Sequence, residues 1–247
     1  MKQRSAKAIR LRNNIFVHAI LAVLAVVWMF PVLWVILTSF RGEKGSYVSS
    51  FFPKTYTLDN YIKLFTDTTL LNFPRMFMNT LIIAICSCLL SSFFVLSASY
   101  CLSRLKFKLR KPYMNMAMIL GLFPGFMSMV AVYFILKAVG LTEGNNVRIA
   151  LILCYSGGAA LSFQIIKGFF DTMPKEIDEA ALIDGCTPIQ TFFSVVLPIM
   201  KPTYISVGIL ETMWIWNDFL LPYLVLDLNK YKTISIAIQY MKGSYGR

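Results

Sequence analysis

The sequence predicts an all-α, polytopic membrane protein, and three observations support this fold class. Hydrophobic residues make up 57% of the 247 residues and charged residues only 15%, with a mean hydropathy of +0.64. Soluble domains carry about 25% charged residues. The chain also contains several long uncharged runs, comparable to the about 20 apolar residues that a helix needs to cross a bilayer. Lysines and arginines cluster beside these runs, as they do at the ends of transmembrane helices.

The first predicted elements are a basic tail over residues 1–14 and a transmembrane helix over residues 15–40. Five lysines and arginines stand in the first twelve residues. The run that follows carries no Asp, Glu, Lys or Arg and contains Pro31, which is expected to kink it. It is too long for a signal peptide and no small-residue cleavage site ends it, so the sequence predicts an uncleaved first span.

Residues 41–75 mix acidic and basic side chains and are predicted to form an external loop. Residues 76–247 then form the predicted core of the protein. Its four further spans are expected at about residues 76–103, 113–136, 149–166 and 203–226. Gly121 to Gly125, with Pro124 between them, are expected to break or kink the third of the five spans.

The orientation of the spans follows from the cations. Residues 104–111 contain five lysines and arginines without one acid, which places this loop and the N-terminal tail in the cytoplasm. Alternation then makes residues 167–201 cytoplasmic as well. This segment carries more acids than bases, so its location depends on alternation and not on its own charge.

Within that segment the sequence predicts a short surface helix. Pro174 suits a first helical turn, and Asp171 and Thr172 are candidate caps before it. Gly185 is expected to end the helix in a left-handed conformation. The adjacent alanines Ala180 and Ala181 leave a bare face to which another protein can pack closely.

The spacing of this segment resembles the E-A-A-x(3)-G-x(9)-I-x-L-P loop of ABC importer membrane subunits, with valine where isoleucine is usual. The matching residues are Glu179, Ala180, Ala181, Gly185, Val195, Leu197 and Pro198. Neighbouring motifs, among them Trp216-Asn217-Asp218-Phe219, are similar to the maltose-type carbohydrate-uptake branch. The resemblance runs from about Met78 to Thr233.

The resemblance implies a type I ABC importer permease bundle in a bacterial inner membrane. Its partners would be a sister permease, a dimer of ABC ATPases that binds the ATP, and an extracytoplasmic solute-binding protein. Glu179 would meet an arginine of the ATPase, with Asp184 as a weaker candidate for the same contact. Relatives end in a further helix, but nothing after Leu226 is apolar enough to form one, so we expect this last helix to be missing. The alternative for the motif is an ordinary interfacial helix.

A second candidate site lies in the fifth predicted span. Glu211 and Asp218 are seven residues apart and share one helix face. Charges inside a membrane usually face a cavity or a partner. With Trp214, Trp216 and Asn217 they are candidates for the wall of a sugar pathway. The alternative is a hydrogen bond that holds helices together.

Other functional classes lack support in the sequence. The net charge of +12 is distributed at the edges of apolar runs, which favours anionic lipid over nucleic acid. No phosphate-binding Gly-x(4)-Gly-Lys-Ser/Thr motif or catalytic motif occurs, so we expect no enzyme activity and no cofactor in this chain. No metal site is expected from one histidine and five cysteines without ligand spacing. The open alternatives are a permease for a polyol, glycerol phosphate or amino acid, and a channel or scaffold that does not couple to ATP.

Overall fold

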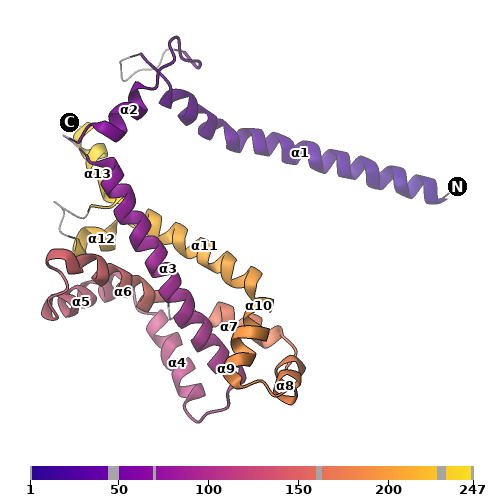
Figure 1. The fold of residues 1–247 in the computed structure, drawn as a ribbon. Coiled ribbons are helices and arrows are strands. Elements are labelled where there is room, and N and C mark those ends of the chain that lie inside the picture. The colour runs from indigo at the N-terminus through magenta and orange to yellow at the C-terminus, as the bar shows by residue number, and fades with distance from the viewer. Residues whose placement is uncertain (1, 44–49, 69–70, 160–162, 227–231, 246–247) are drawn as a thin grey trace. The chain divides into compact units, whose positions relative to one another are not determined.

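The structure, a computed structural model, describes residues 2–43, 50–68, 71–159, 163–226 and 232–245. These residues form helices and their connections (Figure 1), apart from an isolated antiparallel bridge between Arg41 and Tyr56. The chain divides into two compact units, Met1–Asn72 and Phe73–Arg247, which are described separately below.

The first unit is built on one long helix, α1 (Lys2–Ser39). Its apolar part, Asn14–Ser39, is long enough to cross a membrane and matches the predicted span over residues 15–40. The residues predicted as a tail continue the same helix, and Pro31 lies inside it. A second helix, α2 (Asp59–Thr66), lies within the predicted external loop.

A buried arginine organises the loop between these two helices. Arg41 donates to Glu43 Oε2 at 2.7 Å and to the carbonyls of residues 50–51 at 2.9 and 3.1 Å. The second oxygen of Glu43 accepts from the amides of Lys54 and Thr55. Desolvation raises the pKa of Glu43, but the Lys54 amide, the Arg41 guanidinium and the Thr55 amide outweigh it and hold that pKa below its usual value. These bonds tie the residues just after α1 to residues 50–55.

The second unit is organised by α3 (Phe73–Arg104), which matches the predicted span over residues 76–103. One stripe of α3 consists of small, fully buried residues, namely Ala84, Ser87, Ser91 and Ser99. Small side chains let helices approach closely in a membrane. Two helices pack along α3 in this way: α6 (Val147–Ala159) and α7 (Phe163–Thr172).

The third predicted span is not one continuous helix. The structure has α4 (Arg110–Gly121) and α5 (Gly125–Ala138), separated by residues 122–124. The break falls where Gly121 to Gly125 predicted it. Pro124 lacks an N–H and disfavours helical geometry at Phe123, so the helix ends before it. A short 3₁₀ turn, η1 (Gly144–Asn146), then leads into α6.

The later predicted spans are also interrupted. The fourth crosses residues 160–162, which lie outside the described residues, and the axes of α6 and α7 on either side differ in direction by 44°. The fifth is divided into α11 (Lys201–Asn217) and α12 (Leu220–Val225). In the described part of the chain, two helices can span a membrane alone, and four if each bent pair is one span, whereas the sequence predicted five.

The absence of the last family helix stays a prediction, because the helix that follows Leu226 is shorter than a membrane span. The structure has α13 (Ile234–Tyr245), a helix of 12 residues, whose start is held against α3 by the bond from the Ile234 amide to Thr80 Oγ1 at 3.1 Å. The segment escaped notice because it is short and polar at its end. Its apolar residue Ile236 is fully buried in the core formed with α3 and α6.

Candidate functional site

The predicted surface helix is present as α8 (Glu176–Ile183). Its first turn contains Glu176, Asp178 and Glu179, which favour the positive end of the helix dipole. The predicted caps are wrong: the N-cap is Lys175, and its side chain makes no capping bond. Asp171 instead belongs to α7, where its carboxylate accepts from Ser103 at 2.6 Å and pairs with Lys167.

Gly185 ends α8 as predicted, with φ of +86°. The Gly185 amide donates to the Leu182 carbonyl at 3.1 Å and the Cys186 amide donates to the Ala181 carbonyl at 3.0 Å. This pair of bonds is a Schellman motif, which requires a left-handed residue that glycine supplies without steric cost. Asp184 is the exposed C-cap residue just before it.

A buried ion pair joins α8 to the end of α3. Arg104 Nε lies 3.0 Å from Asp178 Oδ2, and the two side chains are only 6% and 14% exposed. The Arg104 Nη2 atom also donates to the carbonyl of Met173 at 3.1 Å, in the connection before α8. α8 is therefore fixed to the last turn of α3, the longest described helix in this unit. Figure 1 shows α8 near this end of α3.

The second half of the motif forms the connection from α8 to α11. Thr187 and Gln190 form a reciprocal capping box at the start of α9 (Pro188–Gln190). A π-helical segment, η3 (Thr191–Val196), and α10 (Leu197–Ile199) follow, and the axis bends by 76° before α11. Val195 and Leu197 are half-buried and Pro198 is exposed. η3 contacts α8, so the structure brings the two halves of the motif together.

The outer surface of this region combines charge with exposed apolar side chains. Glu179 and Ala180 are exposed, whereas Ala181 is buried, so only one alanine of the pair faces outward. Ile183 is 85% exposed, and several neighbours are also exposed apolar residues: Leu182, Ile189 and Phe193. A cleft of about 290 Å³ between the end of α3, α8 and α9 is lined by Glu179 together with the cations Lys106 and Lys175. Surfaces that combine exposed apolar side chains with a charged rim are common at protein interfaces.

The pathway candidates lie in the second half of α11 and at its C-cap, about 15–25 Å along the helix from Lys201 at 1.5 Å per residue. Glu211 is half-buried beside Ser91 of α3, and among the described residues its Oε1 atom has no hydrogen-bond partner. Trp214 is 76% exposed, and Asn217 is exposed with its amide bonded to the Met213 carbonyl. Trp216 instead packs its ring edge-on against Phe77 of α3.

Asp218 joins several helices. Its backbone is extended at the C-cap of α11, so α11 does not continue through it. Its Oδ2 atom accepts from the Tyr155 hydroxyl of α6 at 2.8 Å, and Oδ1 accepts from the Leu220 amide at the start of α12 at 3.0 Å. Its backbone carbonyl accepts from Ser235 of α13 at 2.6 Å. These bonds are those expected if Asp218 holds helices together, which was the alternative to a place in the sugar pathway.

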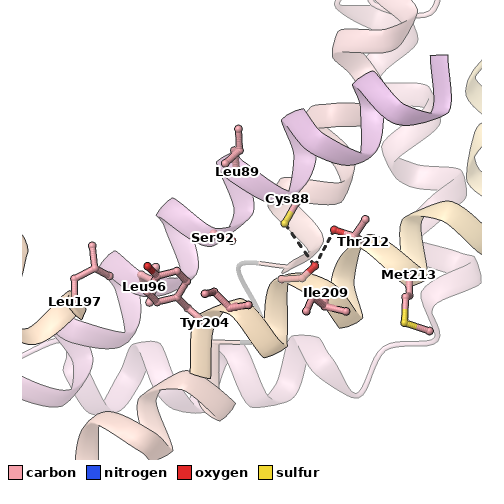
Figure 2. Close-up of a pocket in the computed structure, with 11 residues that line it drawn as sticks. Cys88, Leu89, Ser92, Leu96, Leu197, Tyr204, Ile209, Thr212 and Met213 are labelled. Atoms are coloured by element: carbon pink, nitrogen blue, oxygen red, sulfur yellow. Dashed lines mark hydrogen bonds between the residues drawn. The ribbon is translucent and has the colours of Figure 1, made fainter. Parts of the chain in front are cut away.

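A groove of about 530 Å³ separates the outer faces of α3 and α11 (Figure 2). Cys88 and Gly208 form its closest approach, with Cys88 Sγ 3.5 Å from the Gly208 carbonyl. The remaining lining is mostly apolar, and the Thr212 hydroxyl is already bonded to the same carbonyl at 2.8 Å. Ser92 and Tyr204 are the other polar residues of the lining, so the groove offers few hydrogen-bonding groups to a sugar.

Comparison with known proteins decides the family. Residues 95–244 match the family described as "Binding-protein-dependent transport system inner membrane component". The chain belongs to this family. The matched region contains α8, the connection to α11 and the pathway candidates, and it makes the chain a multi-pass permease component of a transport system, as the resemblance implied.

Several relatives of this permease component are named as subunits of carbohydrate transport systems. It is 32% identical to the probable starch degradation products transport system permease protein AmyC of Thermoanaerobacterium thermosulfurigenes, covering 90% of this chain and 80% of the relative. It is 31% identical to the maltodextrin transport system permease protein MdxG of Bacillus subtilis, covering 95% and 83%. A solved bacterial ABC transporter involved in alginate import has the same fold, with a TM-score of 0.76 at 18% identity, covering 94% of this chain and 79% of that chain.

Two residues of the permease site were missed from the sequence. Arg104 was interpreted only as one cation of a basic loop, and Asp178 was not singled out. An opposite-charge pair separated by 74 positions has no periodic signal along the chain. It becomes visible only when α3 and α8 lie side by side.

Proposed function

We propose that this permease subunit moves a sugar or oligosaccharide into the cytoplasm and that α8 docks into a partner ATPase. The carbohydrate substrate is supported by the names of relatives that transport starch degradation products and maltodextrin. The observation that carries the coupling role is the geometry of α8. The helix is anchored to its own subunit through Asp178 while Glu179 and Ile183 project outward.

The mechanism follows from what α8 is attached to. The Arg104–Asp178 pair connects α8 to α3, and the contact with η3 connects it to α10 and the start of α11. A displacement of α8 is therefore transmitted to two helices together. When partner ATPases close around ATP, α8 moves with them, and the bundle rocks between inward-open and outward-open forms. ATP is bound by the partner, and this chain contributes no cofactor and no catalytic step.

The proposed assembly contains a sister permease subunit, an ATPase dimer and an extracytoplasmic solute-binding protein. The N-terminus, the basic loop over residues 104–111 and α8 face the cytoplasm. Glu211, Trp214 and Asn217 are the proposed pathway residues. Glu211 offers a buried carboxylate oxygen without a described partner, and Trp214 offers an exposed ring. Trp216 and Asp218 are proposed to hold the helices in place.

The coupling role is tested by reversing one charge. Glu179→Lys is expected to lower the amount of ATPase that copurifies with the permease by about tenfold, because a charge-assisted interface bond contributes a few kcal/mol. Membrane insertion should be unchanged, since Glu179 is exposed in this subunit. Glu176→Lys is the matched control, with the same charge change in the same exposed turn. Normal copurification and uptake in Glu179→Lys would refute the proposal.

The substrate class is tested by binding-protein-dependent uptake across oligosaccharides, monosaccharides, polyols, glycerol phosphate and amino acids. We expect the strongest uptake for oligosaccharides. Preference for a polyol, glycerol phosphate or amino acid would keep the coupling role but reject the sugar. Uptake that is independent of the ATPase would instead support a channel, and no uptake with a stable complex would support a scaffold.

A further inference from the structure

The loop between α1 and α3 carries an apolar surface that the transport function does not explain. We propose that residues 50–66 lie in the membrane interface, with Leu58 at the N-cap of α2 and Ile62 within α2 in contact with lipid acyl chains. The partner is thus a lipid surface. The proposal concerns the first unit alone and requires only that α1 spans the membrane.

The first step places the end of α1 at the interface. The apolar part, Asn14–Ser39, has 26 residues. At 1.5 Å per residue this is about 39 Å, against about 30 Å of hydrocarbon and about 40–45 Å with the headgroup regions. Ser39 therefore lies in the headgroup region and not in bulk water.

The second step fixes α2 at this depth. Asn60 Nδ2 donates to the carbonyls of Ser39 and Arg41, both at 3.0 Å, and so satisfies carbonyls at the end of α1. The Ser39 and Tyr61 hydroxyls are 2.7 Å apart, and the Tyr61 ring packs on Phe40 with centroids 5.3 Å apart. Four contacts thus pin the first turn of α2 to the point where α1 leaves the hydrocarbon.

The third step shows that the loop turns back toward the hydrocarbon. The Phe51 ring packs against Phe30 and Trp34 of α1, with centroids 5.5 and 5.1 Å apart. Phe30 precedes Ser39 by about 13 Å along the helix, at 1.5 Å per residue. Phe52, which packs edge-on against Phe51, is exposed. Trp34 precedes Ser39 by about 8 Å, so its ring lies near the boundary between hydrocarbon and headgroups, where aromatic residues form a belt, and Phe51 reaches from there toward the hydrocarbon.

α2 has an exposed apolar face. Leu58 and Ile62, four residues apart on one face, are 58% and 56% exposed. Asp59 and Lys63 lie about 100° further around the helix, so a charged face adjoins the apolar one. A short helix with one apolar and one charged face, held at the interface, lies in its plane with the apolar face toward the acyl chains.

The experiment measures depth with lipid-bound quenchers. The full chain, with its five cysteines replaced, carries a bimane label at Ile62→Cys or, as the matched control, at Lys63→Cys, in phosphatidylcholine–phosphatidylglycerol nanodiscs. Doxyl-labelled lipid is expected to quench the label at residue 62 at least about threefold more than at residue 63, with aqueous iodide showing the opposite order. Equal quenching at the two positions would overturn the proposal.

A second measurement needs no substitution. The unmodified chain is irradiated in nanodiscs containing phosphatidylcholine with a diazirine in its acyl chain, and the lipid-modified peptides are mapped. Modification within residues 50–66 is expected. If this segment stays unmodified while α1 is modified, protein or water covers it and the proposal fails. The same holds if modification disappears on addition of the solute-binding protein, because the surface would then be a protein-docking site.

Discussion

Arg104 is the residue on which the placement of α8 depends. It is the last residue of α3, and its guanidinium reaches both Asp178 and the carbonyl of Met173. Both charged side chains are almost fully buried, at the edge of the cleft that Glu179 also lines. Removing one member of such a pair typically costs about 3–5 kcal/mol, because the other charge stays buried and unpaired.

We therefore predict that Arg104→Gln lowers the thermal stability of the purified subunit and reduces ATPase copurification, although Arg104 does not belong to the exposed face of α8. The double variant Arg104→Gln with Asp178→Asn should recover part of the loss, because no uncompensated charge remains. Lys106→Gln, in the same basic loop, is the control and should leave stability unchanged. A single variant as stable as the control would show that the ion pair does not hold α8.

The contrast between Gly185 and Arg104 shows what the sequence could reveal at this scale. Gly185 was predicted because a glycine after a short amphipathic segment has a local meaning, and its φ of +86° confirms it. The caps Asp171 and Thr172 failed because α7 extends further than its apolar run indicated. Arg104 and Asp178 could not be paired because their partnership is tertiary.

At the scale of elements, the helix breaks are the main difference from the sequence prediction. Hydropathy measures how apolar a run is but not whether its backbone is continuous, so α4 and α5 were predicted as one span, as were α11 and α12. The break at Pro124 was signalled by a residue type. The break at Asp218 was not, because the sequence does not distinguish a carboxylate that accepts from the Leu220 amide from one that lines a pathway.

This break leads to a prediction about Asp218. Asp218→Ala removes the acceptor for Tyr155 and for the Leu220 amide, so α6 and α12 lose a shared anchor. We expect a loss of stability of about 1–3 kcal/mol, measured as a lower thermal midpoint, together with reduced assembly. Tyr155→Phe, which removes only one of the bonds, should have a smaller effect. If the variant has normal stability but has lost uptake, the result would support a role of Asp218 in the sugar pathway instead.

At the scale of the whole molecule, the open question is which segments share a side of the membrane. In the second unit the ion pair places α8 beside the connection between α3 and α4, which contains the basic residues that the positive-inside rule assigns to the cytoplasm. The connection from α5 to α6 contains η1, and the bent pair of helices α6 and α7 separates it from α8 along the chain. If α6 and α7 together cross the membrane, these two connections face opposite sides.

We predict that a membrane-impermeant maleimide labels Ile183→Cys in inverted vesicles and Glu143→Cys in spheroplasts, each in a background without the native cysteines. Both positions are exposed, so the difference reports sidedness and not burial. Leu109→Cys, in the basic connection, is the internal reference and should follow residue 183. Labelling of residues 143 and 183 from the same side would mean that α6 and α7 form a re-entrant loop. In that case α8 would remain attached to α3 through Arg104, but its motion could not be transmitted across the bilayer through α7.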